Sequence, residues 1–301
     1  MTLLIDIPTA DEYPTRKAHE PALLYRRSPT VWGSADGGPF SAEEIADYDR
    51  RGYTQIDSLV SGEEVQAYRA ELERLSADPG LRGDDRVVVD PESGGVQSVY
   101  AVHELSDVFA ELVNDPRLVG RARQILGSDV YVHQSRVNHK PGFGGGSFFW
   151  HSNFEAWHAE DGMPRMRAVS FSVALTENHP HNGALMAIPG SHRTFVSCVD
   201  PAPSPHHRTP PKTRGVGVPD ESSLSLLAHQ HGIEVLTGPA GGATVFDANC
   251  MHGSGDNITP HPRSDVFVVF NSVENACTAP FGSSGPRPEH IASRDFTPVG
   301  R

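Results

Sequence analysis

The stretch DVYVHQSRVN (residues 129–138) is the point at which the chain changes character. It is rich in β-branched residues, which favour strands, and similar short segments separated by Gly, Pro and Asn turns follow it. These later segments are 167–176, 185–188, 233–236, 243–246 and 266–272. Many short strands of this kind predict an antiparallel sandwich or barrel, with helices packed outside it.

The chain before residue 129 indicates helices instead. Ser41 with Glu44 and Ser61 with Glu64 each match a capping box, in which side chains bind the first free amides of a helix. After the second box, apolar residues recur at helical spacing, at Val65, Tyr68, Leu72 and Leu75.

These patterns predict a single domain over residues 1–301. We expect an extended arm over 1–40, a mainly helical part over 41–127 and a jelly-roll core over 128–301. Within the helical part, a stretch over 104–126 is interrupted at Asp115-Pro116, because proline disfavours helix in the residue before it. A Pro-, His- and Ser-rich insertion at 199–223 is either a surface loop or a lid over a site.

The composition excludes some classes of function. Acidic residues outnumber basic residues by 38 to 25 among 301, and this net charge of −13 argues against nucleic-acid binding and favours a small-molecule ligand. Three scattered cysteines are too few for a disulfide framework and indicate a reducing compartment. No segment predicts export or a membrane span, so we expect a cytoplasmic protein.

The stretch SFFWHSNFEAWHAEDGMPRM (residues 147–166) is the densest in side chains suited to chemistry. In strand geometry His151 and Asn153 point to the same side, because side chains alternate with period two. A His-X-Asp pair at this spacing, joined by a distant second His, supplies three ligands on one face of an iron ion. A His-X-Asn pair is also common on a surface or in a core, so both interpretations stay open.

The second histidine is His252, in FDANCMHGSGDN (246–257). Eleven residues later comes Arg263, a fixed planar cation suited to holding the far end of a dicarboxylate by two hydrogen bonds. These features predict one jelly-roll site by their order along the chain. The order is a strand, the His pair, a sheet, a Pro-Gly-Ser-His turn at 189–192, and then a His followed by an Arg.

Longer stretches make a resemblance specific. HSNFEAWHAEDGMPRMRAVSFSVALTENHPHNGALMAIPGSHR (151–193) resembles the signature of ectoine hydroxylases, a branch of the phytanoyl-CoA dioxygenase-like oxygenases. Further matching stretches cover nearly the whole chain: DEYPTR (11–16), GRARQILGSDVYVHQSR (120–136), CMHGSGDNITP (250–260), FNSVEN (270–275) and RDFTPV (294–299).

The resemblance implies a double-stranded β-helix of the cupin type, the cofactors iron(II) and 2-oxoglutarate, O2 as cosubstrate, the product 5-hydroxyectoine and a homodimer. The metal positions of the family correspond to His151, Asn153 and His252. Its cosubstrate positions fall on Arg263, Ser254, Asn138 and Phe148. Its substrate pocket falls on Gln134, Arg136, Trp157, Ser170, Phe246 and Phe267.

The residues themselves are compatible with such a pocket. Gln134, Arg136 and Asn138 alternate along one strand, so they share a face that lines a cavity or lies in solvent. Ectoine is a small zwitterion, and Arg136 or Gln134 suits its carboxylate while the aromatic residues suit its cyclic amidinium. Each aromatic residue is equally suited to a core.

One departure bears on activity, because the iron-binding carboxylate of the family is an aspartate and this chain has Asn153. An amide is neutral and binds Fe(II) more weakly than a carboxylate. Three explanations compete: a deliberately disabled variant, a natural homologue with lost or altered activity, and an enzyme that tolerates the amide and turns over slowly. His139, Ala156, His179, His181 and Ala248 also depart from the family pattern, and we expect several of them near the site.

Two other classes of function remain open. A non-catalytic binding protein would keep the pocket and bind ectoine or a similar zwitterion without iron. A metal enzyme of another type, such as an isomerase or a hydrolase, would need no 2-oxoglutarate, and Arg263 argues against it.

Overall fold

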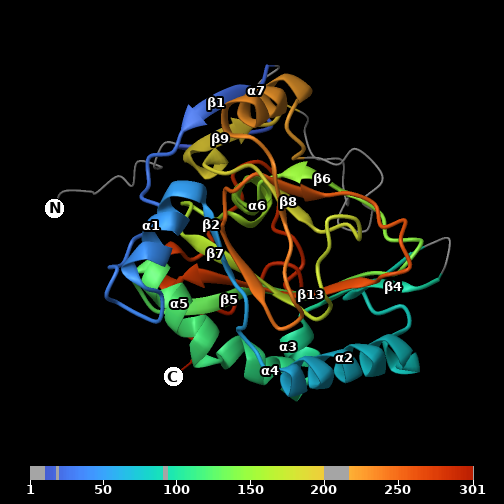
Figure 1. Ribbon diagram of the computed structural model, residues 1–301. Coiled ribbons are helices and arrows are strands. Elements are labelled where there is room, and N and C mark those ends of the chain that lie inside the picture. Colours follow the sequence, from blue (N-terminus) through green and yellow to red (C-terminus); the bar gives the residue numbers. More distant parts are fainter. Residues whose placement is uncertain (1–10, 18–19, 91–93, 200–216, 301) are drawn as a thin grey trace.

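A seven-stranded antiparallel sheet forms the centre of the computed structural model, which describes residues 11–17, 20–90, 94–199 and 217–300 (Figure 1). Each strand pairs antiparallel with its neighbours. The order across the sheet is β2 (Tyr53–Ile56), β11 (Ala243–Asp247), β7 (Ala168–Ala174), β13 (Arg263–Ser272), β5 (Val130–Lys140), β4 (Val96–Tyr100) and β3 (Val87–Val89).

A second sheet of four antiparallel strands completes the jelly roll. Its order is β10 (Glu234–Leu236), β8 (Leu185–Ala187), β12 (His252–Ser254) and β6 (Phe148–His151). A separate two-stranded ribbon joins β1 (Ala22–Tyr25), from the N-terminal arm, to β9 (Thr194–Ser197). This ribbon lies on the same side of the core as α7 (Glu221–His231) (Figure 1).

Helices cover one face of the large sheet. They are α1 (Ala42–Arg51), α2 (Gly62–Ala77), α3 (Val102–Leu105), α4 (Asp107–Asn114) and α5 (Pro116–Leu126). Both predicted capping boxes are present, at Ser41 and at Ser61. The predicted break at Asp115-Pro116 is also present, because Asp115 ends α4 and its side chain accepts a hydrogen bond from the first turn of α5.

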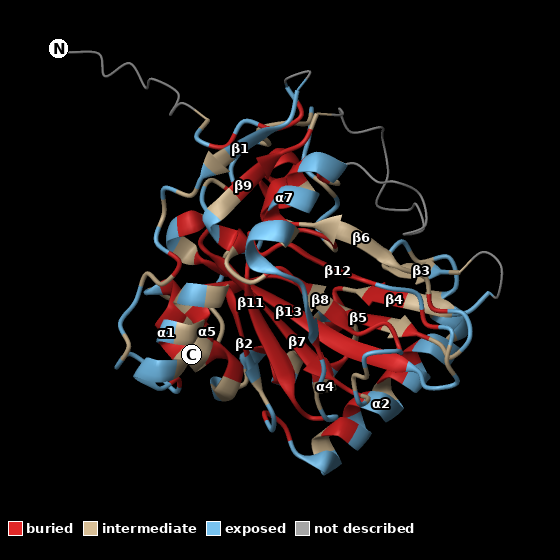
Figure 2. Cartoon of the chain, turned by 45° about the horizontal axis from the view of Figure 1, so that its top comes forward, coloured by how far each residue is buried: buried red, intermediate tan, exposed pale blue. Residues whose placement is uncertain are grey.

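The main hydrophobic core lies between these helices and the outer face of the sheet. Val137 of β5 and Val266 of β13 are fully buried in it, together with Phe109 of α4 and Ile125 of α5. Figure 2 shows β7, β11 and β13 buried along their length. Because side chains alternate along a strand, the neighbours of Val137 and Val266 point to the other face, which the small sheet covers.

Two sheets of antiparallel strands with helices outside form a double-stranded β-helix, so the predicted fold class is confirmed. The sequence did not reveal the short strands β1, β2, β3, β4, β9 and β12. The insertion predicted at 199–223 is partly wrong, because Glu221 already begins α7 with Asp220 as its N-cap. Residues 200–216, the centre of that insertion, lie outside the described residues, as does the start of the N-terminal arm.

Candidate metal centre

Two histidines face each other across the small sheet. His151 ends β6 and His252 begins β12, and the two residues are direct partners in the antiparallel register. Their ring centroids lie 4.3 Å apart. The sheet therefore brings together the two histidines that the sequence suggested, although about a hundred residues separate them.

Hydrogen bonds fix the tautomer of both rings. His151 Nδ1 lies 2.7 Å from the Phe149 carbonyl, and His252 Nδ1 lies 2.9 Å from the Cys250 carbonyl. Because a carbonyl oxygen only accepts, each Nδ1 donates and each Nε2 keeps a free lone pair. Burial lowers the pKa of both imidazoles, so they are neutral near pH 7, the form that binds metal.

Asn153 stands at the third position, but not on a strand. It is the first residue of α6 (Asn153–Ala156), with Ser152 as N-cap, so the expectation of strand geometry beyond His151 is wrong. Asn153 Nδ2 donates to Ser170 Oγ at 3.4 Å, and this direction leaves the amide oxygen as the atom that can bind a metal.

The nearby carboxylates do not replace the missing aspartate. Glu155 accepts hydrogen bonds from Thr15 and Arg16, and Asp247 is paired with Arg26. Among the described residues, no group of three or more His, Cys, Asp or Glu side chains is suited to hold a metal ion. The donor set thus fits a metal through two imidazoles and one amide, all neutral, which is a weaker set than two imidazoles and a carboxylate.

A basic end of the candidate site is formed where β5 pairs with β13, next to β12. Lys140, the last residue of β5, is 3% exposed, and its Nζ donates to Ser254 Oγ at 2.7 Å and to the Gly255 carbonyl at 2.8 Å. The ammonium also lies 5.1 Å from the ring centroid of Phe148. Burial and then the charge of Arg263 lower the pKa of Lys140 to about 7. The sequence reasoning missed this residue.

Arg263 is the register partner of Lys140 and is also buried. Its Nη1 donates to the Gly183 carbonyl at 3.0 Å, its Nε donates to Asn178 Oδ1 at 3.2 Å, and its Nη2 lies 2.7 Å from Asp265 Oδ2. Asp265 thus already compensates the charge of the guanidinium, whereas the hydrogen bonds of Lys140 within the described part of the chain go to two neutral oxygen atoms. Together they form a two-cation end that suits an anionic group.

The inner face of the large sheet carries the predicted substrate residues in cross-strand rows. Phe246 pairs with Ser170, and Phe267 of β13 pairs with Arg136 of β5. The Arg136 guanidinium lies 5.1 Å from the Phe267 ring centroid. The Phe246 ring lies 4.9 Å from the His252 ring, which places this aromatic wall beside the histidine pair.

Three other predicted residues already have partners in the protein. Gln134 Nε2 donates to the Ile291 carbonyl at 2.6 Å, and Asn138 Oδ1 accepts from Ser98 Oγ at 2.8 Å. Trp157 begins a short π-helix, Trp157–Asp161, and belongs to a buried cluster in which its ring meets that of His133 at 5.2 Å. The structure shows for Trp157 the core packing that was its alternative interpretation.

The residues that depart from the family pattern are not all near the candidate metal centre. His139 points to the outer face, where its Nδ1 lies 2.7 Å from Ser264 Oγ and it lines a cavity of about 920 Å³ beside α2. His179 and His181 stack on each other in a turn that is partly exposed. Ala156 ends α6, and Ala248 lies just after β11, so these two are the departures close to the metal-ligand segments.

Comparison with known proteins identifies this arrangement. The family model of phytanoyl-CoA dioxygenase (PhyH) matches residues 48–264. The chain belongs to the phytanoyl-CoA dioxygenase family. Within this family it is 56% identical to an ectoine dioxygenase of Streptomyces coelicolor over 290 residues, which is 96% of this chain and 97% of that protein.

Solved structures are also similar to this chain over nearly its whole length. The structure of EctD from S. alaskensis with 2-oxoglutarate and 5-hydroxyectoine is 45% identical, has a TM-score of 0.86, and covers 96% of both chains. The structure of EctD from S. alaskensis with bound Fe has the same identity, a TM-score of 0.87 and 97% coverage of both chains. The resemblance inferred from the sequence motifs is therefore confirmed.

Proposed function

We propose that this chain binds Fe(II) and 2-oxoglutarate and hydroxylates ectoine to 5-hydroxyectoine. The observation that carries the proposal is the neutral His151–His252 pair beside a buried two-cation end, Lys140 with Arg263. The ectoine dioxygenases among its relatives support the choice of substrate, because the similarity extends over nearly the whole chain.

The metal-binding atoms in this proposal are Nε2 of His151, Nε2 of His252 and the amide oxygen of Asn153. The backbone carbonyls behind the two rings hold them in the metal-binding tautomer before any metal arrives. When bound, Fe(II) with 2-oxoglutarate supplies oxidative chemistry that places one oxygen atom of O2 on a substrate carbon and converts the cosubstrate to succinate and carbon dioxide.

The two-cation end would hold the far carboxylate of 2-oxoglutarate. Lys140 and Ser254 already form a hydrogen bond there, and Arg263 adds a second cation across the strand pair. Phe148 lies against the Lys140 ammonium and would limit the length of the dicarboxylate, while Asn138 lies one inner-face position along β5. A monocarboxylate would leave a buried cation uncompensated, which favours a dicarboxylate.

The substrate would lie between the histidine pair and the aromatic wall. Arg136 supplies a cation for the ectoine carboxylate, and Phe246 presents a π-face for its amidinium. Ser170 and Gln134 flank these residues on the same face. Trp157 would support this face without touching the substrate, because its buried cluster includes Val269, the register partner of Gln134.

Asn153 is the observation that favours a second candidate function. A neutral donor set holds Fe(II) weakly, so the chain would turn over slowly, act on another small zwitterion, or bind an ectoine-type ligand without catalysis. Calorimetric titration with ectoine separates the last possibility, since a pure binding protein binds ectoine without iron.

We further propose a cytoplasmic homodimer that uses O2 as its oxidant. The described residues contain no helix long and apolar enough to cross a membrane. The three cysteines are free and buried, which suits a reducing compartment. Size-exclusion chromatography with light scattering tests the dimer.

Product analysis tests the proposed function. The chain is incubated with Fe(II), 2-oxoglutarate, air and ectoine, and 5-hydroxyectoine and succinate are measured by mass spectrometry, with L-proline as a zwitterion that lacks the amidinium. We expect both products in equal amounts, and only with ectoine. Succinate formed without 5-hydroxyectoine would contradict the hydroxylation of ectoine by this chain.

A further inference from the structure

The turn over residues 247–250 connects β11 to β12 and contacts both segments that carry metal-binding residues. Its Cys250 carbonyl accepts the hydrogen bond from His252 Nδ1 at 2.9 Å. Its Ala248 carbonyl accepts from the backbone N–H of Phe154 at 2.8 Å, one residue after Asn153. The position of this turn therefore sets both the orientation of the His252 ring and the start of α6.

Asp247 shapes the turn. Its Oδ1 accepts from the backbone N–H of Asn249 at 2.8 Å, and its carbonyl accepts from the N–H of Cys250 at 3.0 Å. Asn249 in turn donates from Nδ2 to the carbonyls of His192 and Thr194, both at 3.0 Å. The side chain of Asp247 is thus the acceptor around which the turn closes.

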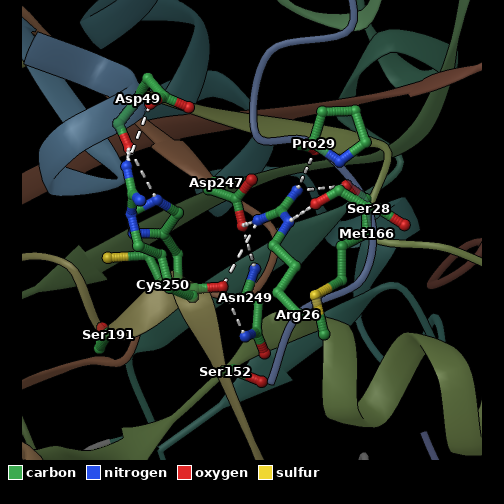
Figure 3. Close-up of polar contacts among 12 residues, drawn as sticks. Arg26, Ser28, Pro29, Asp49, Ser152, Met166, Ser191, Asp247, Asn249 and Cys250 are labelled. Carbon is green, nitrogen blue, oxygen red and sulfur yellow. Dashed lines mark hydrogen bonds and ion pairs between the residues drawn. The ribbon is translucent and has the colours of Figure 1, made fainter. Parts of the chain in front are cut away.

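Arg26 compensates the charge of Asp247 (Figure 3). Arg26 Nη1 lies 2.8 Å from Asp247 Oδ1, and the side chains are 3% and 2% exposed. Arg26 follows β1 in the N-terminal arm, far from Asp247 in the sequence. Among the described residues, its other donors all meet backbone carbonyls: Nε meets Ser28 at 2.9 Å, and Nη2 meets Pro29 at 3.0 Å and Met166 at 2.7 Å.

These contacts hold the Arg26 side chain in one conformation. Carbonyls of two separate segments, the arm at Ser28 and Pro29 and the chain before β7 at Met166, hold its guanidinium in one plane. A planar guanidinium held in this way presents its remaining edge to Asp247 in one orientation. Figure 3 shows the guanidinium between Asp247 on one side and Ser28, Pro29 and Met166 on the other.

We propose that Arg26 and Asp247 are positioning residues for the metal centre, acting through the 247–250 turn on His252 and Asn153. The inference rests on the metal-binding part of the proposed function and not on the identity of the substrate. Neither residue is proposed to touch the metal. Their role is to keep the Cys250 carbonyl against His252 Nδ1, so that Nε2 stays free.

A merely structural ion pair would behave differently. Its loss would lower the free energy of unfolding but leave the tautomer of His252 and the metal affinity of the folded fraction unchanged. A positioning pair, by contrast, changes both in protein that is still folded. Outer-shell partners of metal-binding histidines typically contribute about 10- to 100-fold to metal affinity.

The test uses three variants of the full chain. Asp247→Asn keeps the acceptor for Asn249 but removes the charge, and the double variant Arg26→Met, Asp247→Asn removes both charges, so no buried cation is left uncompensated. The matched control is Glu274→Gln, which breaks the Arg167–Glu274 pair at 2.7 Å. Circular dichroism first establishes that each variant is folded.

Two measurements test the proposal without depending on enzyme activity. The first is the imidazole ¹⁵N chemical shift of His252 in metal-free protein, assigned with His252→Gln. The second is the Co(II) dissociation constant by calorimetry. We expect a single Nδ1–H tautomer in the parent, a mixture in the double variant, and Co(II) binding that is about 10- to 100-fold weaker, with the Glu274 control within about twofold of the parent.

The outcomes separate the two proposals. A folded double variant with an unchanged tautomer and unchanged Co(II) affinity overturns the positioning role. If the parent itself binds no Co(II), the metal-binding part of the proposed function fails, while the tautomer shift still decides whether Arg26 and Asp247 orient His252. If Asp247→Asn unfolds but the double variant folds with a parent-like tautomer, the pair serves stability alone and the inference is wrong.

Discussion

His151 and His252 are register partners in neighbouring strands, and their ring centroids lie 4.3 Å apart. A backbone carbonyl two residues earlier in the chain holds each ring, the Phe149 carbonyl for one and the Cys250 carbonyl for the other. The sheet thus builds two of the three proposed metal-binding positions without any contribution from Asn153. What Asn153 changes is the charge of the donor set.

Arg263→Ala should affect the cosubstrate more than the substrate. The variant removes one of the two cations at the basic end and takes away the ion-pair partner of Asp265, which keeps its hydrogen bond from Asn178. We expect the KM for 2-oxoglutarate to rise about 10-fold or more, because a charged hydrogen bond contributes about 1.5–3 kcal/mol, while the KM for ectoine changes less. Steady-state kinetics with the exposed control Arg74→Ala checks this. Equal effects on both constants would contradict the assignment.

Lys140 should make cosubstrate binding depend on pH. Burial, with the charge of Arg263, lowers the pKa of Lys140 to about 7, so its charge is present below pH 7 and is lost as the pH rises through that value. The dissociation constant of 2-oxoglutarate, measured by anaerobic calorimetry, should therefore increase between pH 6 and 9. Lys140→Arg keeps its charge throughout and should remove this dependence. The same pH profile in parent and variant would argue against Lys140 as a ligand.

Arg136→Met should act on the substrate. Methionine retains much of the apolar contact with Phe267 but removes the cation that is proposed to bind the ectoine carboxylate. We expect the dissociation constant for ectoine to rise about 10- to 100-fold, with 2-oxoglutarate binding nearly unchanged. If 2-oxoglutarate binding weakens by the same factor, Arg136 belongs to the cosubstrate end instead.

His133 and Asp161 should contribute to stability in a defined pH window. Burial alone would lower the pKa of His133, but Asp161 and Cys277 raise it to about 9. The free histidine has a pKa of about 6.5, so this stabilisation is complete below that pH and is lost as the pH rises through about 9.

Asp161 sets the acidic limit of the same window. Burial opposes its charge, but Arg287 and His133 lower its pKa to about 2, so its contribution is lost only as the pH falls from about 4 towards 2. Because the charge of His133 is present at pH 6 and is lost by pH 10, urea unfolding should show a larger difference in the free energy of unfolding between parent and His133→Gln at pH 6 than at pH 10. A difference that grows with pH would contradict this coupling.

The sequence predicted the fold and most of the candidate site for identifiable reasons. Capping boxes and a β-branched strand pattern depend on neighbouring residues, so they can be read from the sequence, as Ser41, Ser61 and residues 129–138 were. Lys140 was missed although it continues the alternation of Gln134, Arg136 and Asn138 on β5. That alternation was the signal that could have identified it.

Other parts of the site have no local signal. Asn153 begins a helix instead of continuing a strand, because Ser152 caps α6 directly after β6. The Arg26–Asp247 pair joins a segment that read as a featureless arm to the end of β11, and only the folded chain brings the two charges together. Pairings between distant segments of this kind follow from tertiary packing and cannot be inferred from one sequence.

Ectoine hydroxylation should be compared between the parent chain and Asn153→Asp. Each protein is supplied with Fe(II), 2-oxoglutarate, air and ectoine, and 5-hydroxyectoine formation is measured by mass spectrometry. We expect the aspartate variant to form 5-hydroxyectoine about tenfold faster or more, because an anionic third ligand completes the site. Absence of 5-hydroxyectoine from both proteins, with iron bound to the aspartate variant, would contradict the claim that this chain is built to hydroxylate ectoine.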